Sequence, residues 1–153
     1  MHKLAITSPF GRLVLGADEH VLLRIRWDET ASAPAETASP ILQETRRQLE
    51  AYAERRLRIF DLPMQTDGNE LQEQVWAMMR TIPYGSTMTY GEMARRLGAD
   101  ARDVGGVCGT NRIPIVIPCH RVVGEGGRMT GFSGGRGVAS KAQLLAHEGA
   151  LLL

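Results

Sequence analysis

The residues of this sequence that are best suited to chemistry surround Cys119. The thiol follows a proline and the apolar run 113–117, and His120 and Arg121 come directly after it. A thiol at the edge of a packed segment, beside two groups that favour the thiolate, is typical of an activated nucleophile. Neighbouring side chains of an extended segment point to opposite faces, so we expect His120 to reach the thiol through a water molecule or a backbone shift and not directly. The alternative is a small buried side chain without chemistry, which fits Cys108 better.

Neither cysteine indicates a metal site. Cys108 and Cys119 lie eleven positions apart, which matches no zinc-binding spacing, and the N-terminal part offers only His2 and His20 as soft ligands. We therefore expect no metal site.

The basic residues are concentrated in the C-terminal part of the chain. The formal net charge is +1, and sixteen of the eighteen basic residues are arginine, the side chain best suited to planar anions. From Arg95 to Arg136, seven arginines accompany three acidic residues, which gives this stretch a local charge of +4. Two interpretations stay open for it, a phosphate-binding face and an ordinary solvated surface.

Composition places the chain among ordinary globular proteins. It has 153 residues, of which 43% are apolar and 23% are charged. No apolar run approaches the roughly 20 residues that cross a bilayer, and charges interrupt the first thirty residues. The sequence predicts no membrane span and no signal peptide, and we expect a cytoplasmic protein with reduced thiols.

The elements that must position these residues differ between the two halves of the chain. The N-terminal half begins with three short β-rich segments that predict an antiparallel meander, at residues 3–8, 12–16 and 21–27. A small, polar, proline-bearing loop follows at 29–40, then a helix at 41–56 and a further strand at 57–62. We place a domain boundary near Asp67, with domains at 1–67 and 68–153.

The C-terminal half is predicted to be mostly helical. Apolar residues at helical spacing predict one helix over 71–82, which must stop before a proline. Thr89, with a glutamate three positions later, has the pattern of a capping box for a short helix that ends at Gly98. A second short helix is expected from Asp100 to about Gly109, and the pair forms a helix-turn-helix candidate. A last helix is expected from about 139 to 148.

The C-terminal half resembles a known protein family in the sequence and the order of its motifs. The string IPIVIPCHRVVG is similar to the signature of the O6-alkylguanine-DNA alkyltransferases, and four further blocks follow the order of that family. They are IPYGSTMTYGEMARRLG, ARDVGGVCGTN, TGFSGG and KAQLLAHEG, which together cover nearly all of residues 70–149. The N-terminal half is similar only in its strand–helix outline.

The resemblance implies catalytic roles for five residues. Cys119 matches the alkyl acceptor, His120 the water-linked base beside it, and Glu148 the carboxylate that orients the histidine. Asn111 matches the asparagine that ties the helix-turn-helix to the active-site segment. Tyr90 matches the tyrosine that helps to turn the nucleotide out and donates a proton to the leaving guanine.

The resemblance also implies contacts to the base and to DNA. Carbonyls around the acceptor cysteine and Val122 match those that accept from the guanine amino group, Phe132 lies at the pocket rim, and Ser133 matches a residue on the O6 side. Arg102 matches the arginine that fills the vacated stack. We also expect Arg121, together with the tyrosine, among the DNA contacts.

Three positions depart from the usual family pattern. Arg112 stands where proline is common, Asp103 places a negative charge beside the intercalating arginine, and Phe132 replaces a frequent tyrosine. The family implies no zinc site here, because its N-terminal zinc ligands have no counterparts in this sequence. These departures bear on the geometry of the turn, on the affinity for DNA and on the size of the alkyl group that the pocket accepts.

The expectation is an α/β protein in two parts, an RNase H-like antiparallel sheet with a helix and a mostly helical, winged-helix-like domain with a helix-turn-helix. Its implied function is direct, single-turnover repair of O6-alkylguanine without a cofactor, with O4-alkylthymine left open. The implied partner is double-stranded DNA, bound in the minor groove by a monomer, without a membrane. The main alternative is a non-catalytic protein that binds alkylated DNA. A cysteine hydrolase is a third hypothesis, but it would need a histidine distant in sequence and an oxyanion site.

Overall fold

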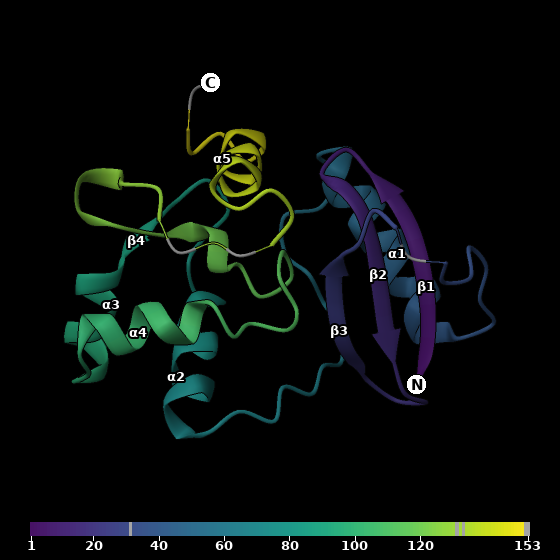
Figure 1. Cartoon of the computed structure of the whole chain (residues 1–153), viewed down its shortest axis with the longest axis horizontal. Helices are drawn as coiled ribbons and strands as arrows, with labels where there is room; N and C mark the ends of the chain where they lie inside the picture. Colours follow the sequence, from purple (N-terminus) through teal and green to yellow (C-terminus); the bar gives the residue numbers. More distant parts are fainter. Residues whose placement is uncertain (31, 131, 133, 152–153) are drawn as a thin grey trace. The chain divides into compact units, whose positions relative to one another are not determined.

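The computed structural model describes the whole chain except residues 31, 131, 133, 152 and 153. The chain divides into two units, Met1–Thr66 and Asp67–Leu153 (Figure 1). In the part of the chain that is described, no helix has the length and apolar character needed to cross a membrane.

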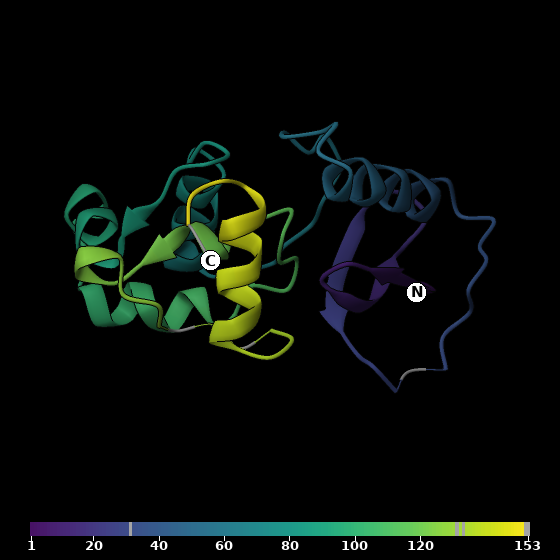
Figure 2. The same ribbon diagram turned by 90° about the horizontal axis from the view of Figure 1, so that it is seen from above.

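The N-terminal unit is a three-stranded antiparallel sheet covered by one helix. The strands are β1 (His2–Ser8), β2 (Gly11–Ala17) and β3 (Leu22–Trp27), in the order β1-β2-β3, and α1 (Pro40–Ala53) packs on one face (Figure 2). The apolar side chains of the sheet and helix form the core of this unit, with Leu4 opposite Leu15 and Leu15 opposite Ile25 across the ladder. This arrangement confirms the predicted meander and helix.

The predicted strand at 57–62 is wrong. Residues 57–62 pair with no strand in the described part of the chain, and the isolated bridge between Leu22 and Met64 follows them, where the amide of Leu22 donates to the carbonyl of Pro63. Leu62 is buried, but Ile59 points into solvent with 84% of its surface exposed. The segment follows Arg55, which has a positive φ of 62°, so the chain turns sharply after α1 instead of entering a strand.

The C-terminal unit is built from helices around a small parallel pair of strands. Its elements in chain order are α2 (Glu70–Met79), β4 (Met88–Thr89), α3 (Tyr90–Leu97), α4 (Ala101–Cys108), the 3₁₀ turn η1 (Cys119–Arg121), β5 (Val122–Val123), the 3₁₀ turn η2 (Glu125–Gly127) and α5 (Val138–His147). β4 pairs with β5 in parallel, Met88 beside Val122. Because the strands run in parallel, with Thr89 beside Val123, the start of α3 lies next to the end of β5, and η1 leads into the start of β5.

Capping residues set the helix boundaries as predicted. The Thr89 hydroxyl accepts from the amide of Glu92 at 3.0 Å, and α3 ends at Gly98 in the left-handed region. Asp100 caps α4 by accepting from the amide of Arg102 at 2.7 Å. The reciprocal capping box lies at Asn69 instead, before α2. That helix is shorter than predicted and ends three residues earlier, at Met79.

Candidate active site

Cys119 lies in a buried turn that is held by the segment before it. The turn places the cysteine amide 2.8 Å from the carbonyl of Ile117, and the Asn111 amide group donates to the same carbonyl at 2.8 Å. The Asn111 side-chain oxygen accepts from the amide of Ile113 at 3.0 Å. Ile115, which lies between Ile113 and Ile117 in the sequence, has a positive φ of 74°. Asn111 therefore fixes a strained apolar loop whose end presents the thiol.

Cys119 is only 7% exposed. Burial raises the pKa of Cys119, and a hydrogen bond from Asn111 and the positive charge of Lys141 oppose that rise. Cys108 differs, because burial in α4 and the neighbouring Cys119 raise its pKa to about 12. Both cysteines are free thiols.

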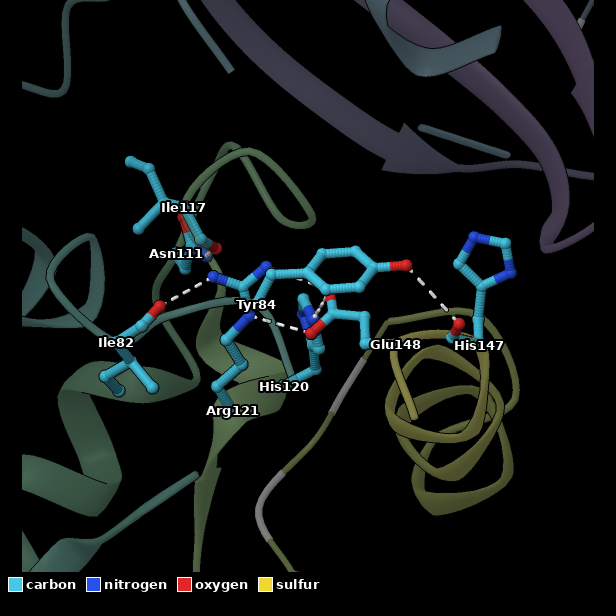
Figure 3. Close-up of polar contacts among 8 residues, drawn as sticks. All are labelled: Ile82, Tyr84, Asn111, Ile117, His120, Arg121, His147 and Glu148. Atoms are coloured by element: carbon cyan, nitrogen blue, oxygen red, sulfur yellow. Dashed lines mark hydrogen bonds and ion pairs between the residues drawn. The ribbon is translucent and has the colours of Figure 1, made fainter. Parts of the chain in front are cut away.

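His120 and Glu148 form a buried pair that reaches from η1 to the end of α5 (Figure 3). His120 Nε2 lies 2.8 Å from Glu148 Oε2, and both side chains are shielded from solvent. A carboxylate only accepts, so the shared proton belongs to Nε2, and Nδ1 is left as an acceptor. Among the described residues this buried Nδ1 has no hydrogen-bond partner. Burial lowers the pKa of His120 despite the carboxylate, which favours a neutral imidazole ready to take a proton.

The expected DNA contact by Arg121 is wrong, because its side chain is inside the protein. Its Nε and Nη2 donate to the two oxygens of Glu148 at 2.8 and 3.0 Å, and Nη1 donates to the carbonyl of Ile82 at 2.7 Å. The side chain is 7% exposed, so its charge belongs to the buried pair and not to a surface.

Tyr90 begins α3 beside a buried lysine that the sequence analysis missed. The Tyr90 hydroxyl donates to the carbonyl of Thr130 at 3.1 Å, and Lys141 Nζ donates to the same carbonyl at 2.7 Å and to the hydroxyl at 3.3 Å. Burial is the main cause that raises the pKa of Tyr90 to about 12. Lys141 is fully buried. Its spacing to Leu144 and Glu148 puts it on the inward stripe of the last helix, and this periodicity was the signal that could have found it.

The remaining predicted residues fall into three groups. Val122 is fully buried in β5, and its amide donates to the carbonyl of Cys119, which closes the turn. Phe132 is half-buried, and Ser133 lies outside the described residues. Arg102 is exposed in the first turn of α4, where no other predicted site residue lies.

The described residues contain no cluster of three or more histidine, cysteine, aspartate or glutamate side chains that could hold a metal ion. The side chains brought together are instead a thiol, a neutral imidazole paired with a carboxylate, a phenol and an ammonium group. This set suits proton removal from a thiol and proton donation to a leaving group.

Comparison with known proteins covers both units. Residues 70–150 match the family described as 6-O-methylguanine DNA methyltransferase, DNA binding domain, and residues 1–66 match its ribonuclease-like domain. Methylated-DNA–protein-cysteine methyltransferases of Mycolicibacterium paratuberculosis and Shigella flexneri are 40% and 39% identical, over 94% and 97% of this chain and 89% and 95% of theirs.

Solved structures agree with the sequence matches. The crystal structure of Mycobacterium tuberculosis OGT in complex with DNA has a TM-score of 0.87 and 37% identity, and the alignment covers 98% of this chain and 94% of that one. A second structure, of the Mycobacterium tuberculosis O6-methylguanine methyltransferase, has a TM-score of 0.86 and 36% identity over 97% and 93%. This agreement of sequence and fold along nearly the whole chain shows that it belongs to the 6-O-methylguanine DNA methyltransferase family.

Proposed function

We propose that this chain repairs O6-alkylguanine in double-stranded DNA by transferring the alkyl group to Cys119. The observation that carries the assignment is the buried turn that joins this thiol to the paired His120 and Glu148, whose facing atoms lie 2.8 Å apart. The protein acts as a monomer in the cytoplasm, where reducing conditions keep its two cysteines as thiols.

The relay begins at the thiol. A water molecule takes the Cys119 proton to His120 Nδ1, the acceptor that the pairing with Glu148 leaves available. The resulting imidazolium is stabilised by the adjacent carboxylate. Asn111 hydrogen-bonds the sulfur and Lys141 adds a positive charge, so both favour the thiolate.

The transfer itself is a direct displacement. The thiolate sulfur forms a bond to the alkyl carbon while the bond from that carbon to O6 breaks, and the electron pair of that bond stays with the guanine. Tyr90 gives its hydroxyl proton to the guanine, and Lys141, 3.3 Å from that oxygen, stabilises the phenolate that remains. The product is a thioether on Cys119, which nothing in the scheme removes, so each molecule acts once.

The damaged nucleotide must leave the duplex to reach a buried sulfur, which costs a few kcal/mol. We propose that α4 enters the minor groove and that Arg102, exposed at its first turn, occupies the gap in the stack. A non-catalytic lesion-binding protein would need the groove contacts but not the thiol or its proton relay. The presence of both favours repair.

The test is to incubate the protein with a duplex that contains O6-methylguanine and to map the added methyl group by mass spectrometry. We expect one methyl group per protein molecule, on Cys119. Cys119→Ser should abolish transfer and keep DNA binding, because a hydroxyl has a far higher pKa at nearly constant volume. Cys108→Ser is the matched control and should react like the parent protein. Methylation of Cys108, or several repaired guanines per protein molecule, would contradict the proposal.

A further inference from the structure

Arg121 is the third member of the buried group that contains His120 and Glu148, and it binds the Glu148 carboxylate. Its guanidinium binds both carboxylate oxygens of Glu148 in parallel, and its remaining nitrogen donates to the carbonyl of Ile82 at 2.7 Å (Figure 3). The ring of Tyr84 lies 5.8 Å from the guanidinium carbon, and the Tyr84 hydroxyl donates to the backbone carbonyl just before Glu148 at 3.4 Å. Three segments that are distant in sequence therefore meet at this one side chain.

The bidentate contact restricts how Glu148 can turn. Two parallel hydrogen bonds hold the carboxylate plane in one orientation, and Oε2 then accepts from both Arg121 and His120. The guanidinium therefore fixes the orientation of the carboxylate, and the carboxylate fixes the orientation of the imidazole. A single carboxylate at the end of a helix would lack this second constraint.

The same contact sets the charge of the buried group. With a neutral imidazole, the charges of Glu148 and Arg121 cancel, and protonation of His120 leaves a buried net charge of one. Burying an uncompensated charge is expensive, so the guanidinium favours the neutral imidazole. Without Arg121 the preference reverses, because only an imidazolium could then neutralise Glu148.

We propose that Arg121 is a positioning residue that acts through Glu148 and keeps His120 aimed and uncharged, so that it sets the pH range in which Cys119 can be deprotonated. The proposal rests on the proposed function for its kinetic consequence, but the charge of His120 can be measured without DNA. It gives the buried arginine a role in the chemistry instead of in DNA contact.

Other charged groups near His120 do not replace this effect. In the part of the chain that is described, burial and the positive charges of Arg121 and Lys141 lower the pKa of His120, and Glu148 raises it. Lys141 extends from α5 toward Tyr90 and Thr130, and in the described part of the chain the hydrogen bonds of its Nζ go to those two residues. Cys119, the neighbour on the same turn, is neutral until it gives up its proton.

The first experiment follows the His120 ring by NMR as a function of pH in the DNA-free protein. In Arg121→Met we expect the His120 midpoint to rise by about one pH unit or more. Arg121→Lys keeps the charge but loses the parallel contact, so we expect a smaller rise, and this milder variant serves if the first does not fold. Arg47→Met is the matched control, because Arg47 makes a similar bidentate contact with Glu44 at 2.7 and 2.6 Å on an exposed face. An unchanged midpoint in a folded Arg121 variant overturns the proposal.

The second experiment measures the single-turnover rate of alkyl transfer against pH. The acidic limb of the Arg121→Met profile should move to higher pH together with the NMR midpoint. A purely structural role would lower the rate by the same factor at every pH, and that result contradicts the proposal. If the parent protein transfers no alkyl group to Cys119, the proposed function fails, while the NMR titration still decides the role of Arg121.

Discussion

Lys141 is a buried residue whose charge acts on two groups of the candidate site, Tyr90 and Cys119. Its ammonium group donates to the Tyr90 hydroxyl at 3.3 Å, and its charge lowers the pKa of Cys119 against the effect of burial. Burial lowers the pKa of Lys141 itself, and the two nearby thiols counteract this. In the proposed mechanism, one cation thus favours both anions, the thiolate that forms before the transfer and the phenolate that remains after it.

We predict that Lys141→Met raises the pKa of Cys119 and slows alkyl transfer. Loss of the ammonium removes an attractive charge near the sulfur and leaves the burial penalty in place. The measurement is the ultraviolet absorbance of the thiolate against pH, in a Cys108→Ser background so that only one thiol titrates. Lys3→Met is the control, since Lys3 is exposed on β1 and is the other lysine of the chain. An unmoved titration would mean that Lys141 serves only to hold Tyr90 and Thr130.

At the scale of elements, α4 is the helix on which the proposed nucleotide flipping can be tested. Its first turn presents Arg102 to solvent, next to the capping Asp100 and to Asp103. Those two carboxylates stabilise the N-terminus of the helix but repel the phosphates of DNA. A phosphate contact alone by Arg102 would therefore be weak. An arginine that enters the stack works differently, since its planar group replaces a base.

We therefore predict that Arg102→Ala slows repair of duplex DNA much more than reaction with free O6-benzylguanine, which needs no flipping. Both rates are measured in single-turnover assays at two salt concentrations. Arg96→Ala is the comparison, because Arg96 is exposed on α3 and paired with Glu92 at 2.9 Å. It should weaken binding of damaged and undamaged duplex alike. Equal losses on both substrates for Arg102→Ala would mean that this residue supports the fold or the pocket.

Elements with local signals could be predicted from the sequence, and contacts between distant segments could not. Thr89 and Asp100 mark helix starts because a cap bonds to an amide within three residues of itself. The 57–62 segment failed because a strand needs a partner, and its β-rich composition carries no information about one. His120 and Glu148 are 28 positions apart, so their pairing came from family resemblance. Arg121 was misplaced for the same reason: nothing near it in sequence indicates the carboxylate that buries it.

At the scale of the whole molecule, repair should change stability. We predict that methylation of Cys119 lowers the free energy of unfolding by about 1–3 kcal/mol, because an added methyl group must fit into a packed site that leaves Cys119 only 7% exposed. A benzyl group should cost more. Urea unfolding of repaired and unreacted protein measures the difference, and protein incubated with undamaged duplex is the control.

Hydrogen exchange should locate the loss in the C-terminal unit, Asp67–Leu153, which contains the acceptor. Equal stability before and after repair would mean that the site already holds space for the alkyl group.

The position of Glu148 also determines when the proposed relay can form. Glu148 ends α5 and lies 28 positions after His120, so a chain still being synthesised carries Cys119 well before it carries the carboxylate. Synthesis runs from the N-terminus, and the relay exists only once α5 has formed and packed against η1. An incomplete chain holds Cys119 and His120 without the carboxylate of Glu148, and a chain that has lost α5 returns to that condition. On the proposed mechanism, a protein that is consumed by one reaction thus gains its full reactivity only when its fold is finished.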